Sequence, residues 1–396
     1  MAKKVALVLS GGGFKGAFQV GALQYLKKNW FKIDPSGNPM KFDLIAGVSV
    51  GSLNGVLLAG NKFDQLEKLW QDVAKNGVEE IYTSDFIDTK SKEDTVQFKI
   101  NFKNLAKTFI PNFSLKNISI GSKLGAIFSK PKREAVFNEM LDIAKDDLSK
   151  SLRNFKSIAD NTPLKMKLTS FVRRADIKDV KYFCGYVSLN DGVYYSVNSN
   201  DFVSDADFVN GILASTAMPI VWPPVETINT INQNPNSNTQ KYSVDGGVRN
   251  VSPLGDIIKE INKDPSNDYL IIVINCSSGE ISPEDYKEKG LASIALRSLN
   301  DIALTEVFNN DIEEFVKIND LLDQVKSINP NAEIKNYDPK TRTRTKTLKH
   351  FNAIIIQPDG DTLGDSLVAN EGLIQKRLDH GQFKAQQALD NGFIFV

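Results

Sequence analysis

The chain has 396 residues, enough for a large α/β domain or for on the order of two or three domains of average size. Its hydrophobic fraction of 41% and charged fraction of 24% are typical of a folded globular protein, which excludes a fibrous or disordered chain. The 48 basic and 48 acidic side chains cancel. A dedicated nucleic-acid binder has an excess of basic residues, so we expect no nucleic-acid partner.

The cysteines and the apolar runs limit the chemistry and the location further. Cys184 and Cys276 both lie in apolar stretches, so the sequence predicts neither a disulfide framework nor a Cys/His metal site. The apolar run Val5–Leu9 is too short for a secretory signal, and no run reaches the roughly 18 apolar residues of a membrane-spanning helix. We therefore expect a cytoplasmic protein without a signal peptide or transmembrane helix; the alternatives are peripheral contact with a membrane and secretion through a signal of another kind.

The N-terminal region alternates between strand-like and helix-like segments. Strands are predicted at Val5–Leu9 and Phe42–Ala46, and helices from about Lys15 to Lys28 and from about Gly51 to Ala59. This βαβ order indicates a parallel sheet covered by helices. Residues 61–160 have the pattern of helix and loop.

The later segments add strands to this sheet and close with a helix. Strands are expected at Leu164–Arg173, Lys181–Leu189, Gly192–Asn198, Tyr242–Val244, Tyr269–Asn275 and Ala353–Ile356. An Asn-rich loop is expected at Asn229–Gln240, and helices at about 289–325 and 370–389. The alternating run Thr341–Thr347 predicts an exposed edge strand protected by charge, with head-group binding as the less favoured alternative.

A G-x-S-x-G sequence stands at residues 47–51, directly after one predicted strand and before a helix. This context is that of a nucleophile elbow, where a tight turn pushes the serine hydroxyl out at the helix N-terminus. Ser49 is therefore a candidate nucleophile. The alternative is a turn of small residues with a helix-capping serine.

The run GGGFKG at residues 11–16 also lies between a strand and a helix. Consecutive glycines leave backbone N–H groups free to bind an anion, and the helix adds its positive end. The same run fits the dinucleotide fingerprint through Gly11, Gly13 and Gly16, with Asp34 as a ribose partner. That interpretation ranks lower, because it leaves residues 47–51 unexplained and places Asp34 in a turn.

A serine nucleophile needs a base. His350 and His380 are the two histidines, and neither has a catalytic motif around it. Asp245 ends a short predicted strand and is followed by two glycines. A carboxylate within hydrogen-bond reach of the serine takes its proton if apolar walls raise its pKa toward neutrality. The alternative for Asp-Gly-Gly is an ordinary turn.

Together these motifs resemble those of patatin-like lipid acyl hydrolases. The glycine loop, GVSVG, the run Ala214–Pro219 with Trp222-Pro223-Pro224, and Asp245-Gly246-Gly247 follow one another in that family's order. The resemblance covers roughly Lys4 to Pro253. It implies a three-layer α/β/α fold with a mainly parallel central sheet. We expect a catalytic core over residues 1–260, with residues 261–396 completing or extending the same domain.

The resemblance also implies a reaction and its residues. Ser49 is the nucleophile, and Asp245 completes a Ser–Asp dyad without histidine. The oxyanion hole falls to Gly11, Gly12, Gly13 and Val50, with supporting motif positions at Lys15, Gly16, Gly47, Gly51, Gly246 and Gly247. The family often has Arg where this chain has Lys15, which keeps the charge but not the two-pronged geometry.

The expected substrate is a phospholipid or another acyl-lipid ester, and the scheme needs no metal or organic cofactor. The alternatives are an acyltransferase with the same acyl-enzyme and a lipid-binding protein without turnover. A basic amphipathic helix is predicted by Phe98, Phe102, Leu105 and Phe109, beside Lys99, Lys103 and Lys107. Core packing is favoured for it over membrane contact or a role as a lid. Tyr194, Tyr195 and Trp222 are candidates for an acyl pocket, with plain core packing favoured.

Overall fold

A computed structural model of the protein describes residues 4–87, 155–233, 236–285, 287, 294, 297–338 and 341–391. In this part of the chain an eight-stranded sheet has the order β10-β7-β1-β2-β3-β6-β5, and β4 pairs with β3. The strands are β1 (Lys4–Leu9), β2 (Leu44–Val48), β3 (Lys181–Ser188), β4 (Tyr194–Asn198), β5 (Val225–Asn229), β6 (Thr239–Asp245), β7 (Tyr269–Ile274) and β10 (Asn352–Ile356). The pairs from β10 to β3 are parallel, whereas β4, β5 and β6 pair in antiparallel fashion.

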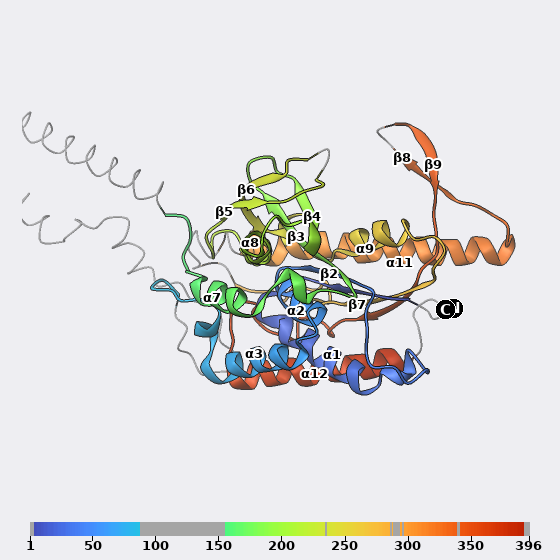
Figure 1. Cartoon of the computed structure of the whole chain (residues 1–396). Helices are drawn as coiled ribbons and strands as arrows, with labels where there is room; N and C mark the ends of the chain where they lie inside the picture. Colours follow the sequence, from blue (N-terminus) through green and yellow to red (C-terminus); the bar gives the residue numbers. More distant parts are fainter. Residues whose placement is uncertain are drawn as a thin grey trace, which may run out of the picture.

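Helices cover both faces of the sheet (Figure 1). They are α1 (Gly16–Lys28), α2 (Val50–Ala59), α3 (Phe63–Asn76), α7 (Thr162–Phe171), α8 (Asp205–Ser215), α9 (Leu254–Ile261), α11 (Leu304–Ile328) and α12 (Glu371–Asp390). α1, α3 and α12 lie on one side, and α9 and α11 lie on the other. The three-layer α/β/α fold with a mainly parallel sheet is confirmed.

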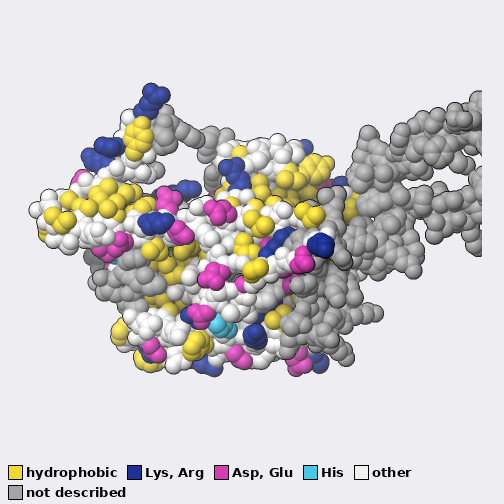
Figure 2. Space-filling view, turned by 180° about the vertical axis from the view of Figure 1, so that it is seen from behind, with side chains coloured by type: hydrophobic (Ala, Val, Ile, Leu, Met, Phe, Trp, Pro, Cys, Tyr) yellow, Lys and Arg dark blue, Asp and Glu magenta, His cyan; other side chains and the backbone are white. Residues whose placement is uncertain are grey.

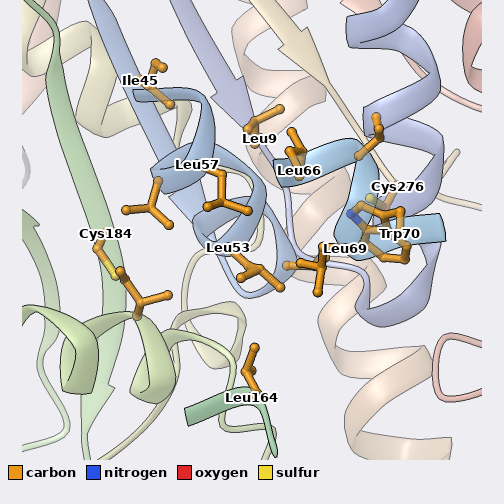
Figure 3. Packing of buried hydrophobic residues seen from close by; sticks show 14 of the residues in the cluster. Leu9, Ile45, Leu53, Leu57, Leu66, Leu69, Trp70, Leu164, Cys184 and Cys276 are labelled. Carbon is orange, nitrogen blue, oxygen red and sulfur yellow. The ribbon is translucent and has the colours of Figure 1, made fainter. Parts of the chain in front are cut away.

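The composition of β1 explains this arrangement. Its residues are almost all buried, as expected for a strand in the middle of a parallel sheet with both faces covered. Leu7 and Leu9 pack with α1, α2 and α3, whereas Ala6 and Val8 pack with α9 and α11, so successive side chains serve opposite layers. Figure 3 shows Leu9 and Ile45 of the sheet facing Leu57 of α2 in the first of these layers.

Two strands that carry candidate residues end against each other on the same edge of β3. β2 pairs with β3 up to Val48 opposite Gly185, and β6 pairs with β3 from the other direction up to Asp245 opposite Tyr186. β4 overlaps both stretches and therefore occupies the other edge of β3. The C-terminal ends of β2 and β6 thus meet at neighbouring positions, which brings residues distant in sequence together.

The residues after 260 complete this sheet. β7 pairs with β1, β10 pairs with β7, and α12 packs along α1. The strands predicted near residues 5–9, 42–46, 181–189, 192–198, 242–244, 269–275 and 353–356 are all present, with ends shifted by a few residues.

The strand predicted at Leu164–Arg173 is wrong, because this segment forms α7. Leu164 and Leu168 are buried at helical spacing, whereas Met166 between them is 69% exposed. Pro163 at the start of the segment is well placed in the first turn of a helix. α8, α9 and β5 were not predicted.

The run Thr341–Thr347 contains β9 (Thr343–Thr347), which pairs with β8 (Lys335–Asp338) in a separate two-stranded sheet. The predicted amphipathic segment around Phe98–Phe109 lies outside the described residues. Basic and acidic side chains are interspersed over the described part of the face in Figure 2, without a continuous area of one sign. None of the described helices combines the length and the apolar character that crossing a bilayer requires.

Candidate active site

Ser49 occupies a strained turn between β2 and α2. Its backbone has φ 56° and ψ −129°, a conformation that residues with side chains rarely adopt. The turn is held by Ser215, whose hydroxyl accepts a hydrogen bond from the Ser49 N–H at 3.0 Å and donates one to the Gly185 carbonyl at 2.6 Å. Ser49 is 6% exposed. The Ala214–Pro219 run, one of the motifs noted in the sequence, thus contains the residue that holds the turn at Ser49 in place.

The glycines on either side of Ser49 are required by close backbone contacts. A Cβ on Gly47 would lie 2.3 Å from the Gly51 carbonyl oxygen, and a Cβ on Gly51 would lie 2.2 Å from the Leu9 carbonyl oxygen. Neither backbone neighbour moves without disturbing β1 or α2. The G-x-S-x-G spacing therefore reflects how tightly α2 leaves the sheet beside β1.

We expect Gly51→Ala to lower the free energy of unfolding by about 3 kcal/mol, because the new methyl group overlaps the backbone of β1. The matched control is Gly55→Ala in the same helix, where the nearest atoms are side-chain atoms of Ile45 and Tyr182 at 3.2 Å. There the better helix propensity of Ala, about 1 kcal/mol, offsets the crowding. Denaturant unfolding of both variants measures the difference, and equal losses would contradict the backbone argument.

Asp245 ends β6 beside this turn and is 4% exposed. Its N–H donates to the Ala217 carbonyl, and its Oδ1 accepts a hydrogen bond from the Gly247 N–H at 2.8 Å. Burial raises the pKa of Asp245 from 3.8 to about 7, against the lowering by hydrogen bonds with the Ser49 hydroxyl and the Gly247 N–H. The carboxyl group therefore exchanges its proton near neutral pH while next to the Ser49 hydroxyl.

The glycine loop packs directly against Ser49. A Cβ on Gly11 would lie 3.2 Å from Ser49 Cβ. The Gly11 N–H donates to the Val251 carbonyl at 2.9 Å and the Phe14 N–H to the Ser366 carbonyl at 2.8 Å. Between them, the N–H groups of Gly12 and Gly13 have no acceptor among the described residues. The N–H of Gly11, one of the four predicted oxyanion donors, is thus already engaged.

Ser49 lies between two cavities. The larger, of about 330 Å³, contains Ser49 and Asp245 together with polar and charged side chains, among them Lys15, Asp361 and Asp365. The smaller is lined almost entirely by apolar groups: Gly13, Phe14, Ser49, Val50, Leu53, Leu69, Trp70, Val73, Ile81, Asn161, Leu164, Thr216 and Trp222. Figure 3 shows Leu53, Leu69 and Trp70 near one another, with Leu164 approaching from α7. Ser49 therefore lines both a polar and an apolar cavity.

A family model described as patatin-like phospholipase matches residues 7–258, more than half of the chain. The chain belongs to the patatin-like phospholipase family. This membership confirms the predicted resemblance and supports lipid acyl hydrolase activity in general. No curated protein matches the chain in sequence.

Solved structures of bacterial proteins are similar to this patatin-like chain. VipD from Legionella pneumophila has 13% identity and a TM-score of 0.39, over 99% of this chain and 68% of VipD. The type III effector protein ExoU has 14% identity and a TM-score of 0.29, over 98% of this chain and 53% of ExoU. The complex of ExoU with SpcU from Pseudomonas aeruginosa has 13% identity and a TM-score of 0.28, over 98% of this chain and 51% of that chain. The chain thus spans about half the length of ExoU.

The remaining sequence candidates lie away from Ser49 in this patatin-like chain. His350 contacts Asp323 on α11, and His380 packs against Phe18; neither histidine lines the larger cavity. Asp34 follows α1, at the opposite end of that helix from the glycine loop, and bonds within its own turn to Ser36. The dinucleotide alternative therefore loses its ribose partner.

Other predicted residues divide between the site and the core. Trp222 lines the apolar cavity, whereas Tyr194 donates to Asp256 and Tyr195 to Asp191 away from it. Lys15 contacts Asp361 at 3.5 Å, an acidic partner from the C-terminal region that the motif did not indicate. Both cysteines are free and buried, and Cys276 packs against Gly12. The described residues contain no group of three or more His, Cys, Asp or Glu side chains placed to hold a metal ion.

Proposed function

We propose that the protein hydrolyses lipid esters through a Ser49–Asp245 dyad and an acyl-enzyme. The observation that carries this proposal is the meeting of Ser49 and Asp245 at the facing ends of β2 and β6, where the carboxyl pKa is about 7. A carboxylate with that pKa is suited to accept the serine proton at neutral pH. The patatin-like family match supports the substrate class.

The proposed reaction has two halves. Ser49 Oγ attacks the ester carbonyl carbon while Asp245 accepts its proton, and the carbonyl oxygen becomes an oxyanion. The tetrahedral intermediate expels the alcohol, which receives the proton from Asp245, and leaves the acyl group on Ser49. A water molecule, activated by Asp245, then releases the fatty acid and restores the serine.

The oxyanion hole in this proposal consists of the N–H groups of Gly12, Gly13 and Val50. The first two have no acceptor among the described residues. Val50 is the first residue of α2, where helix N–H groups lack intrahelical partners and the helix dipole is positive. Each such donor contributes on the order of 3 kcal/mol to the transition state. Gly11 takes a supporting position, since its N–H is bound to Val251.

The two cavities give the substrate an orientation. The first carbons of the acyl chain enter the apolar cavity of about 40 Å³ beside α2, α3 and α7, because transfer of hydrocarbon from water to an apolar cavity is favourable. The alcohol part of the ester remains in the polar cavity, from which it leaves to solvent. Asp245 lies on the polar side, where the departing oxygen needs its proton.

Release of fatty acid tests the proposed function. The purified chain is incubated with p-nitrophenyl esters and with phosphatidylcholine vesicles, and free fatty acid is measured by mass spectrometry. We expect turnover of both, with fatty acid and alcohol formed in equal amounts. Binding of vesicles without release of fatty acid would instead support a lipid-binding protein, and transfer to an added alcohol would support an acyltransferase.

The apolar cavity predicts how acyl-chain length is selected. Leu69→Ala enlarges the cavity, so we expect the ratio of kcat/KM for p-nitrophenyl dodecanoate over butanoate to rise about tenfold, the value of 1 to 2 kcal/mol of added apolar burial. Leu66→Ala is the control, since Leu66 is also a buried leucine of α3 but does not line the cavity. An equal rise of this ratio in both variants would show that the acyl chain does not bind in this cavity.

A further inference from the structure

Arg377 of α12 is the largest side chain that is fully buried in the described part of the chain. Its guanidinium donates to three main-chain carbonyls: Nε to Leu363 at 2.8 Å, Nη1 to Val368 at 2.9 Å and Nη2 to Asp365 at 2.7 Å. Burial lowers its pKa to about 10, so it stays charged at neutral pH. Burying a charge is costly, and here the cost is offset by three hydrogen bonds to carbonyl groups of one short loop.

The loop that Arg377 holds, residues 363–368, touches the glycine loop beside Ser49. The Ser366 carbonyl accepts the Phe14 N–H at 2.8 Å, and a Cβ on Gly13 would lie 2.3 Å from the same oxygen. Tyr82 donates to the Leu367 carbonyl at 3.2 Å, which adds a second attachment. Ser366 thus sits between carbonyls that Arg377 binds and sets the position of Gly13 and Phe14.

We infer that Arg377 is a positioning residue for the glycine loop, acting through Ser366 to hold the Gly12 and Gly13 N–H groups beside Ser49. Arg377 and residues 363–368 lie outside the residues matched by the family model, so the C-terminal region contributes to the site. The inference rests on the proposed oxyanion hole. Three donors with a fixed planar spacing suit this task, and a lysine in the same place lacks that geometry.

The test compares Arg377→Lys and Arg377→Met with wild type on a soluble ester and on its thionoester, in which sulfur replaces the carbonyl oxygen. An oxyanion hole with correct geometry favours the oxygen ester strongly. We expect both variants to lower kcat for the oxygen ester at least about tenfold with KM within about threefold, and to shrink the oxygen-to-sulfur preference about tenfold. If Arg377→Met does not fold, Arg377→Lys alone provides the comparison with wild type.

The control Ala385→Gly distinguishes positioning of the glycine loop by Arg377 from a general contribution of Arg377 to the stability of α12. Ala385 lies about two turns further along α12 and is also fully buried. The substitution destabilises the same helix without altering the guanidinium, so its oxygen-to-sulfur preference should equal that of wild type. If Ala385→Gly and the Arg377 variants shift the preference alike, or if Arg377→Lys keeps it unchanged, the inference is overturned.

Hydrogen exchange separates this inference from the proposed function. The Phe14 N–H should exchange at least about tenfold faster in Arg377→Lys than in wild type, because its bond to Ser366 weakens. If wild type hydrolyses no ester, the proposed function fails and this exchange rate still decides whether Arg377 positions the loop. If hydrolysis is normal and the exchange rate unchanged, the inference alone fails.

Discussion

Ser49→Ala is expected to reduce ester hydrolysis to less than about one part in ten thousand of wild type, because the acyl-enzyme that we propose forms on the Ser49 hydroxyl. Asp245→Asn should lower kcat by about 10²- to 10⁴-fold, the usual contribution of a general base. Both variants should retain the fold, since Ser49 is held through its backbone and Asn keeps an acceptor for the Gly247 N–H. Initial rates on a p-nitrophenyl ester measure both effects.

Matched controls exist for both substitutions. Ser52→Ala removes a hydroxyl from α2, the helix that follows Ser49. This hydroxyl bonds to Tyr182 and not to Asp245. Asp256→Asn changes a second buried carboxyl group with a raised pKa, which accepts from Tyr194 outside the larger cavity. Both controls should keep activity within about threefold of wild type. Equal losses in the controls and the site variants would show that folding, rather than the dyad, had been disturbed.

The pKa of Asp245 predicts opposite effects of pH on activity and on stability. As a general base, Asp245 must be ionised, so kcat/KM should fall about tenfold per pH unit below pH 7 and level off above it. The folded chain keeps the proton of Asp245 up to about pH 7, whereas the unfolded chain loses it near 3.8. Its contribution to stability is therefore present at pH 4 and is lost as pH rises through about 7.

Asp245→Asn removes this pH dependence, because an amide does not ionise. The free energy of unfolding of the variant minus that of wild type should grow between pH 4 and 7, by up to about 4 kcal/mol, and then level off. Urea unfolding of both proteins across this range measures it. A difference that stays constant with pH would mean that Asp245 keeps its ordinary pKa, and the proposed base would then need another explanation.

Much of the fold was predictable from local patterns. Strands β1, β2 and β7 are short apolar runs of the kind that a doubly covered parallel sheet needs, and the helices after β1 and β2 begin at glycine-rich turns. α7 was mistaken for a strand, because the observation that identifies it as a helix, burial of Leu164 and Leu168 but not of Met166, depends on tertiary packing. Local patterns therefore sufficed to predict the strands in which almost every residue is buried.

The candidate site was predictable only in part for a similar reason. Ser49, Asp245 and the glycine loop have compact motifs. Ser215 lay within a predicted run, but its bridge between Ser49 and Gly185 depends on how α8 ends beside β3. Arg377 was not predicted as a site residue, because an arginine in an amphipathic helix usually faces solvent. A basic residue at a position where the helix pattern places the core is the sign that could have found it.

The facing ends of β2 and β6 on β3 also bear on how the protein folds. Ser49 follows a strand formed by local βαβ contacts, but Asp245 reaches it only when β6 pairs with β3, after a long intervening segment has been closed into a loop. Such non-local pairing is slow, because the entropy of loop closure is lost before the contacts form. In a newly synthesised chain the Ser49–Asp245 dyad that we propose therefore cannot form before this non-local pairing, so the protein would acquire its proposed activity only after β6 has joined the sheet.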